Sequence, residues 1–298
     1  MKFHHKINLH THCTFCDGKD TAEDMVKSAI KKGFTVLGFS SHSIHPLNPE
    51  FYIQPDDDWH IHNENLVSYT DEINRLKVKY AGQIDIFTGF EADYFESSEI
   101  GSSIPDFSKY KKFKPDYLIG SVHFVNTPNG FYTVDNVTES VQEGLKRLYG
   151  IIPGVSDAKE AVCDYFEAQR NMLKKGDFNI LGHADLIRKR NGVLKFFSED
   201  ESWYKEQINL TVKAIKKSGV SVEINTGAIA RGIMDDVYPA SYMMEKLYEN
   251  GIPVCVNSDS HNIDSLDTGF EKAYSVARKA GYKELVYPLK NKTFIIDL

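Results

Sequence analysis

Residues whose side chains can bind transition metals recur along this chain at the C-terminal ends of short apolar segments, and these segments are predicted to form β-strands. Two of these positions hold pairs of such residues, in His10-Thr11-His12 and in Asp259-Ser260-His261. Four more hold a single residue each: His42, Glu91, His123 and His183. Imidazole and carboxylate groups are the ligands that zinc, iron and manganese accept in proteins. The pattern predicts a multinuclear metal site, provided that one fold brings these residues together.

The two paired motifs can each hold one ion. In an extended segment, residues two apart lie on the same side, so His10 and His12 can bind together, and Asp259 and His261 repeat this spacing. The competing interpretation of the first pair is two solvated surface histidines. For Asp259 it is a helix cap, because the residue follows an Asn-Ser turn.

Glu91 is the most informative single residue. A carboxylate directly after the run Ile-Phe-Thr-Gly-Phe is costly to bury unless it is paired or bound to a metal, and it can bridge two ions. Asp17, in the loop beyond the first histidine pair, is a further candidate ligand, although a solvated turn before Gly18 would also explain it. A single histidine is more often structural, but three that share one edge favour a common role.

Seven strands are predicted, and six of them are followed by one of these candidate ligands or end next to it. Segments with helical periodicity lie between them, and most of these helices end at a glycine, which is typical of a helix C-terminus. Apolar strands that alternate with helices indicate parallel βα units and thus an α/β barrel, in which the strand ends converge on one face. The predicted strands are 6–9, 35–41, 84–90, 116–122, 178–182, 221–225 and 253–258; the predicted helices are 22–32, 65–80, 158–175, 203–217, 241–249 and 266–279.

The chain is expected to form a single domain over residues 1–298, because no linker rich in proline or glycine interrupts it. Residues 293–296 could add an eighth strand or be only a tail. Three long connections, about 43–64, 96–114 and 127–157, leave the predicted metal-bearing face, where long loops are usually functional. We interpret them as loops that cover an active site.

Composition excludes several classes of protein. A net charge of −7 argues against binding nucleic acid through the overall field, although it allows a small phosphorylated substrate at a local positive site. No run of about 18 apolar residues predicts a membrane span. The N-terminal residues lack the apolar core of a secretory signal, so a cytoplasmic location is expected. Cys13 and Cys16 form a CxxC pair, for which packing or support of the site is favoured over redox chemistry.

Six segments together resemble the PHP (polymerase and histidinol phosphatase) superfamily over nearly the full chain. They are His10-x-His12, Ser41-His42, Gly89-Phe90-Glu91, Ser121-Val122-His123, Gly182-His183 and Ser258-Asp259-Ser260-His261. Within that superfamily, the run Leu-Gly-His-Ala-Asp-Leu-Ile-Arg that ends at Arg188, and Val-Glu-Ile-Asn-Thr-Gly followed by Tyr238-Pro239, are similar to the histidinol-phosphatase branch.

The resemblance implies a distorted TIM-like (β/α)7 barrel that holds three divalent metal ions (Zn, Fe or Mn). Carried over to this sequence, the first ion would be bound by His10, His12, Glu91 and Asp259. The second would be bound by Asp17, His42 and His261, and the third by Glu91, His123 and His183. Many members have a histidine where Asp17 stands, which puts the preferred metal in doubt.

The activity that follows is hydrolysis of a phosphomonoester, with L-histidinol phosphate as the expected substrate. A hydroxide that bridges two ions would attack phosphorus, and Asp17, His42 and Glu91 are predicted to take part in catalysis. A metal-bound water, Asp17 or a loop histidine could protonate the leaving alkoxide. Three arginines after barrel strands are candidates for binding phosphate, since guanidinium matches its geometry: Arg188, Arg190 and Arg231.

The amine and imidazole of L-histidinol phosphate would need acidic or aromatic partners. The sequence offers several without ranking them: Asp56, Asp57, Asp58, Trp59, Glu64, Phe95 and Tyr117. His4, His5, His45, His60 and His62 fit no ligand pattern, although a loop histidine could touch substrate.

Other functions remain open at this point. A phosphatase of the same superfamily could act on phosphotyrosine proteins or nucleotides. An amidohydrolase-type hydrolase also opens with HxH, but it commonly bridges its metals with a carboxylated lysine on the fourth strand, where this chain has His123. A DNA-editing or structural barrel is disfavoured by the acidic charge. The oligomeric state is not predicted.

Overall fold

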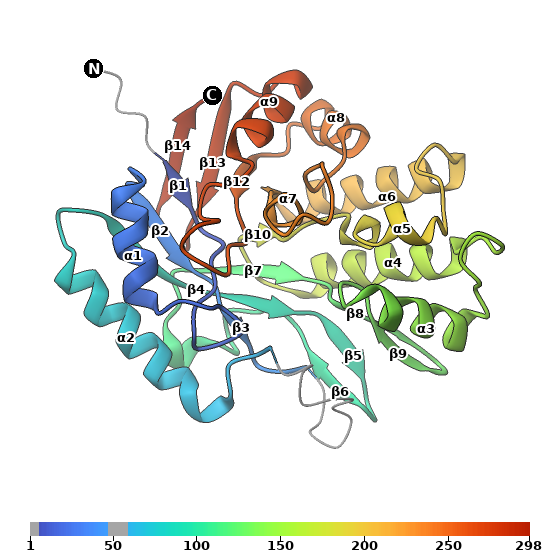
Figure 1. Ribbon diagram of the computed structural model, residues 1–298, viewed down its shortest axis with the longest axis horizontal. Helices are drawn as coiled ribbons and strands as arrows, with labels where there is room; N and C mark the ends of the chain where they lie inside the picture. The colour runs from blue at the N-terminus through green and yellow to red at the C-terminus, as the bar shows by residue number, and fades with distance from the viewer. Residues whose placement is uncertain (1–5, 47–58) are drawn as a thin grey trace.

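The computed structural model describes residues 6–46 and 59–298. Its centre is a parallel sheet that curls into a nearly closed barrel (Figure 1). Seven strands follow one another in chain order, and a short strand β3 (His42–Ser43) pairs with the third of them. The seven are β1 (Ile7–Asn8), β2 (Val36–Phe39), β4 (Asp85–Asp93), β7 (Tyr117–Ser121), β10 (Ile180–Leu181), β11 (Ser221–Asn225) and β12 (Val254–Asn257).

The first and last barrel strands meet just beyond their ends. Thr11 and Ser260 form a parallel bridge, and the His12 amide donates a hydrogen bond of 2.8 Å to the Ser260 carbonyl. Nearer the start of the first strand, the side chain of Asn8 in β1 donates a hydrogen bond of 2.6 Å to the hydroxyl of Ser258, which directly follows β12. The predicted distorted (β/α)7 barrel is therefore confirmed.

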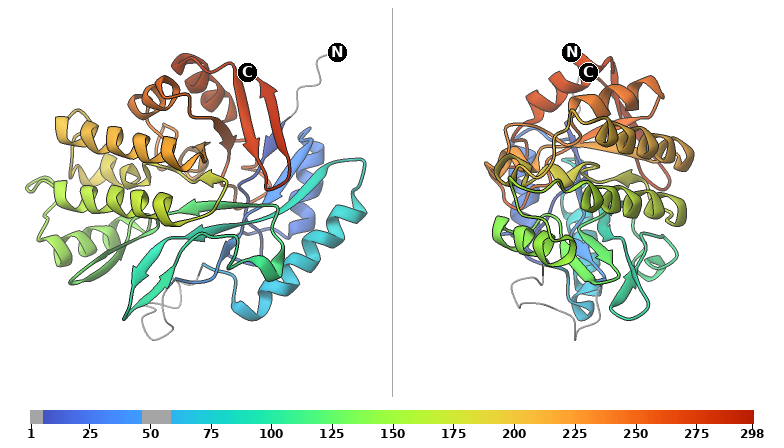
Figure 2. Two further views of the ribbon diagram at one scale, coloured as in Figure 1. Left: turned by 180° about the vertical axis from the view of Figure 1, so that it is seen from behind. Right: turned by 90° about the vertical axis from the view of Figure 1, so that its right-hand side faces the viewer.

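Helices cover the outside of the barrel (Figures 1 and 2). Six of them match the periodic segments of the sequence to within a few residues: α1 (Ala22–Lys31), α2 (Leu66–Lys79), α4 (Lys159–Lys175), α6 (Ser202–Ser218), α8 (Ser241–Glu249) and α9 (Phe270–Ala280). In α1, Met25, Val26 and Ala29 are buried, and Thr21 caps the first turn by accepting a hydrogen bond from the Asp24 amide. The apolar stripe thus fixes which side of the helix faces the strands.

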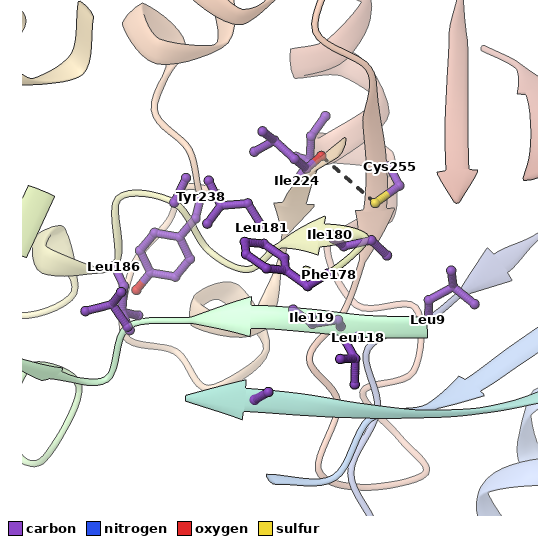
Figure 3. Close-up of a cluster of buried hydrophobic side chains, with 14 of the residues drawn as sticks. Leu9, Leu118, Ile119, Phe178, Ile180, Leu181, Leu186, Ile224, Tyr238 and Cys255 are labelled. Atoms are coloured by element: carbon purple, nitrogen blue, oxygen red, sulfur yellow. Dashed lines mark hydrogen bonds between the residues drawn. The ribbon is translucent and has the colours of Figure 1, made fainter. Parts of the chain in front are cut away.

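The core of the barrel is filled by side chains from neighbouring strands, among them Leu9, Ile119 and Ile180 (Figure 3). Tyr117 is fully buried and donates its hydroxyl proton to the Leu9 carbonyl at 2.5 Å. A Cβ at Gly89 would lie 2.4 Å from the Tyr117 ring, so this ring requires glycine beside it. Tyr117 is therefore a core residue, and the suggestion that it contacts the amine or imidazole of a substrate is wrong.

Residues 293–296 do not complete an eight-stranded barrel. They belong to β14 (Thr293–Asp297), which pairs antiparallel with β13 (Glu284–Pro288) in a separate hairpin. Leu285 and Tyr287 of this hairpin are buried, and the Tyr287 hydroxyl donates to the Val256 carbonyl of β12 at 3.2 Å. The C-terminal segment therefore packs on the barrel from outside.

The connections predicted to be long loops contain their own secondary structure. The connection at about 96–114 holds a hairpin of β5 (Phe95–Ser97) and β6 (Gly101–Ser103), followed by a 3-10 turn, η4 (Lys111–Phe113). The connection at about 127–157 holds the hairpin of β8 (Phe124–Thr127) and β9 (Gly130–Thr133) and then α3 (Thr138–Tyr149). At the end of the connection at about 43–64 lies a short 3-10 turn, η3 (Asn63–Asn65).

Short helical turns also follow two barrel strands: η5 (Leu186–Arg188) and α5 (Asn191–Leu194) after β10, and α7 (Gly227–Ala230) after β11. No helix in the described part of the chain combines the length and apolar character that a membrane span needs.

Candidate metal centre

The nine predicted ligands come together at the carboxyl ends of the barrel strands. Glu91 lies inside β4, which extends three residues further than predicted, and His42 in β3 lies directly across from it. Ligand atoms within 4.8 Å of one another form three groups: His12, Asp17, His42 and His261; His10, His12 and Asp259; His42, Glu91 and His123. His183 completes the set, with its Nε2 2.8 Å from Glu91 Oε1 and 3.3 Å from His123 Nε2.

Glu91 is the central residue of this cluster. Its Oε2 lies 3.0 Å from His10 Nε2 and 3.2 Å from His42 Nδ1, while its Oε1 faces the histidines that follow β7 and β10. Burial opposes ionisation of Glu91, but the surrounding imidazoles more than offset it and hold its pKa well below the usual range. Each oxygen is thus turned toward a different group of ligands, as a bridging carboxylate requires.

Asp259 and Asp17 supply the remaining carboxylates. Asp259 Oδ1 lies 3.3 Å from His12 Nε2, and Asp17 Oδ2 lies 3.0 Å from His261 Nε2. Asp259 adopts a φ of 51°, in the left-handed region that a non-glycine residue rarely occupies, and such strain is often found at functional sites. Its position is therefore fixed by the surrounding fold and not by local preference.

The chemistry of these donors fits metal ions. His12 Nε2 and His42 Nδ1 are buried and make no well-aligned hydrogen bond with the described residues, although carboxylate oxygens of Asp259 and Glu91 lie 3.3 and 3.2 Å away. Burial lowers the pKa of both imidazoles, to about 3 for His42, which keeps them in the neutral form that coordinates metals. Because Glu91 and Asp259 are also buried here, bound cations would supply the charge that these carboxylates need.

A second layer of side chains, which the sequence analysis missed, orients the histidines. Glu223 on β11 lies 2.9 Å from His10 Nδ1, and Asp93 lies 2.6 Å from His123 Nδ1. The other oxygen of Asp93 lies 2.6 Å from His60 Nε2. Carboxylates behind metal-binding histidines fix which ring nitrogen faces the ion. The sequence held two signals: Asp93 is two residues after Glu91 on one strand face, and Glu223 interrupts a buried apolar strand.

The three candidate arginines occupy different surroundings. Arg231 is partly exposed and lies beside the cluster, with Nη2 2.9 Å from Asp259 Oδ2 and Nη1 3.2 Å from His261 Nδ1. A Cβ at Gly227 would lie 2.6 Å from the Arg231 guanidinium, so glycine leaves room for this contact. Arg190 is only partly buried and donates its Nε proton to the Asn136 carbonyl at 2.8 Å.

Arg188 is not placed to bind phosphate, which corrects that prediction. It is buried, and its guanidinium is already surrounded by the carboxylates of Asp185, Glu199 and Asp236 at 3.4, 2.9 and 3.0 Å. The next residue, Lys189, was missed. It is also buried and pairs with Asp135 at 3.2 Å.

The Lys189–Asp135 pair lies beside the cluster. Lys189 interacts electrostatically with Asp259 and Arg231, and Asp135 with His123 and His183. Burial lowers the pKa of Lys189, although the neighbouring Asp135 opposes this. Lys189 thus brings a buried positive charge to the metal-bearing rim.

The CxxC pair supports the first ligand loop. Both thiols are free, with Cys16 Sγ 3.5 Å from His12 Nδ1 and Cys13 Sγ 3.6 Å from Ser41 Oγ. Burial raises the pKa of both thiols. These contacts agree with the predicted packing or supporting role.

The other suggested partners of the substrate amine and imidazole divide into three groups. Phe95 is buried in an aromatic cluster with Phe124 and Phe131, against which the half-buried Trp59 packs. Glu64 is exposed on η3. Asp56, Asp57 and Asp58 lie outside the described residues, as do His4 and His5.

Known proteins resemble this chain over most of its length. Two curated relatives are a probable histidinol-phosphatase of Schizosaccharomyces pombe, 29% identical over 94% of this chain and 88% of that one, and the histidinol-phosphatase of Bacillus subtilis, 26% identical over 89% and 97%. A solved structure of a putative histidinol phosphatase from Listeria monocytogenes matches with a TM-score of 0.77 at 25% identity, covering 90% of this chain and 99% of that one.

A second solved structure, the histidinol phosphate phosphatase of Lactococcus lactis, contains zinc, L-histidinol and phosphate. It shares the fold with a TM-score of 0.69 at 21% identity, covering 97% of this chain and 98% of that one. The PHP domain family matches residues 8–227, and five of the six segments that resemble this superfamily fall within this span; Ser258–His261 lies beyond it. This protein belongs to the PHP family.

Proposed function

We propose that this protein is a metal-dependent phosphomonoesterase that hydrolyses L-histidinol phosphate to L-histidinol and phosphate. The observation that carries the proposal is the cluster of nine ligand side chains around Glu91, of which all but Asp17 and His261 are buried, with Arg231 and Lys189 near it. Curated relatives named histidinol-phosphatase support the choice of substrate.

Three divalent ions, of zinc, iron or manganese, would be held by the residue sets that the family resemblance implies. His10, His12, Glu91 and Asp259 would hold the first, and Asp17, His42 and His261 the second; Glu91, His123 and His183 would hold the third. When bound, such ions activate water, orient a phosphoryl group and neutralise its developing charge.

The residues of the chain itself bind the phosphate and keep the site in order. Arg231 presents a planar set of donors next to Asp259, and Lys189 adds a second positive charge from the loop after β10. Phosphoryl transfer depends mainly on positioning and positive charge, so these two cations suit the reaction. Glu223 and Asp93 hold His10 and His123 in the orientation that a ligand needs.

Burial opposes ionisation of Asp17 at the mouth of the cluster, but His261 at 3.0 Å more than offsets it and holds the pKa of this carboxyl well below its usual range. Asp17 therefore serves as an ionised ligand, and the proton for the leaving alkoxide comes from another group. A cytoplasmic location and the absence of a nucleic-acid partner stay predictions.

The test is a substrate comparison on protein purified without chelators, with its metal content measured by elemental analysis. We expect more than one equivalent of divalent metal per chain. We also expect kcat/KM for L-histidinol phosphate to exceed that for p-nitrophenyl phosphate and for a phosphotyrosine peptide by at least about tenfold, since a site built for one substrate discriminates by its specific contacts.

Glu91→Gln should lose both metal and activity, whereas His62→Gln, at an exposed histidine outside the cluster, should keep them. A preference of less than tenfold would reject L-histidinol phosphate as the substrate.

A further inference from the structure

Two aromatic rings, those of Trp59 and Phe124, lie beside the metal cluster and are called the aromatic wall below. Trp59 is half-buried, and its ring packs nearly parallel to Phe124, with centroids 5.4 Å apart and an interplanar angle of 11°. The same indole lies 6.3 Å from the ring of His42, at 69°. Part of the Trp59 surface is therefore left open next to a predicted metal ligand.

A buried line of polar contacts fixes this wall relative to the cluster. His60, adjacent to Trp59, lies with Nε2 2.6 Å from Asp93 Oδ2, and Asp93 Oδ1 lies 2.6 Å from His123 Nδ1. His60 and Asp93 are at most 2% exposed. Phe124 directly follows His123 in the chain, so both rings of the wall are attached to the same ligand. Asp93 thus links the aromatic wall directly to a predicted metal ligand.

The position of the wall matches the shape of the proposed substrate. In L-histidinol phosphate, three carbons and one oxygen separate the imidazole ring from phosphorus. A phosphate at the cluster therefore leaves the imidazole beside the rim, where a flat aromatic surface can stack on it. Arg231 and Lys189 carry no aromatic ring, and the imidazoles of the predicted ligands would be engaged with the metal ions, which leaves Trp59 as a candidate for this contact.

We propose that Trp59 determines specificity by stacking on the imidazole of the substrate, and that His60 is a positioning residue that holds Trp59 in place through Asp93. This inference rests on the proposed function, because it names the part of the site that recognises the ring. It separates recognition of the ring from recognition of the phosphate.

The experiment compares two substrates: L-histidinol phosphate and O-phosphoethanolamine, which keeps the phosphate and ammonium groups but lacks the ring. Trp59→Leu should lower the ratio of the two kcat/KM values about tenfold, mainly through KM, because stacking and ring burial are lost together. Trp59→Phe should restore most of the ratio. Trp203→Phe, at the other tryptophan of the chain, should leave it at the wild-type value.

His60 is tested with the same ratio and with metal content. His60→Ala should lower the ratio as Trp59→Leu does, and His60→Gln should retain it, because its amide can donate to Asp93 in place of Nε2. A ratio unchanged in Trp59→Leu would overturn the inference while leaving the proposed function intact. If wild-type protein shows no preference for L-histidinol phosphate, the proposed function itself fails. An equal loss on both substrates in His60→Ala, accompanied by loss of metal, would limit His60 to supporting His123 and reject its role for Trp59.

Discussion

Arg188 and Arg231 lie in loops that follow neighbouring barrel strands, but they differ in burial and in the number of carboxylates that they contact. Arg188, after β10, is buried against three carboxylates. Arg231, after β11, is partly exposed and contacts one carboxylate, that of Asp259 in the metal cluster. A cation behind a barrel strand can therefore neutralise a buried acidic group or bind a ligand, and its counter-charges decide which.

Under the proposed function the chemistry takes place on the Arg231 side of the rim, so the largest effect should come from removing the metal ions. Dialysis against a strong chelator should abolish phosphatase activity and lower the melting temperature, because the buried carboxylates lose their compensating charge. Adding back zinc, iron or manganese should restore both. Full activity in metal-free protein would contradict the metal-dependent reaction.

Arg231→Met should reduce kcat/KM about 100-fold, because a charged donor at the edge of the cluster is lost. Arg231→Lys should recover part of the activity through its charge alone, without the planar set of donors. Steady-state kinetics, with metal content measured in parallel, would check this. If activity fell less than threefold, the distinction between the two arginines would be lost.

Lys189→Met should reduce kcat/KM about tenfold, mainly by raising KM, since a buried charge near Arg231 helps to attract phosphate. Lys195→Met, at an exposed lysine six residues further along, is the matched control and should behave as wild type. Equal kinetics in both variants would show that Lys189 serves only to neutralise Asp135.

Arg188→Met should have the smallest effect on catalysis, within about threefold of wild type, but it should lower the free energy of unfolding by about 3 kcal/mol. The reason is that Asp185, which is fully buried, loses its positively charged partner and, among the described residues, keeps only the hydrogen bond from the Ala240 amide. Urea denaturation measures the stability and initial rates measure the activity. A large loss of kcat/KM with unchanged stability would reverse the comparison.

The same variant makes a prediction about pH. Burial raises the pKa of Asp185 to about 6, although Arg188 opposes the shift. Folding therefore takes up a proton at this residue, and the stability that it contributes is present at low pH and is lost as pH rises through about 6. Without Arg188, this loss should move to higher pH and become larger. The gap in unfolding free energy between wild type and Arg188→Met should thus be wider at pH 8 than at pH 5.

The barrel and the ligand set could be predicted because each strand and its ligand residue form a short continuous segment of the sequence. A short apolar run followed by a polar ligand marks a strand end, and parallel strand ends share a face. The pattern indicated Glu91 and His183 without any knowledge of their neighbours. The third strand was placed too short, since β4 continues through Glu91 to Asp93.

The supporting residues could not be found in this way, because their partners come from distant strands. Glu223 meets His10 across the barrel, a contact that depends on the closure of the whole sheet. Arg188 and Lys189 show a second limit. They are consecutive in the chain, so a difference of one residue decides which of the two positive charges interacts with the metal ligand Asp259. A run of basic residues indicates a positive loop but not which member reaches the ligand.

The bridge between Thr11 and Ser260 has a consequence for how the protein is made. His10 and His12 are the first of the predicted ligands to be synthesised. Asp259 and His261, which lie beside them in the fold, are the last. Contacts so far apart in sequence form late. A nascent chain thus offers incoming zinc or iron only part of the ligand set, and tight binding of the ions would follow only after Asp259 and His261 have been synthesised.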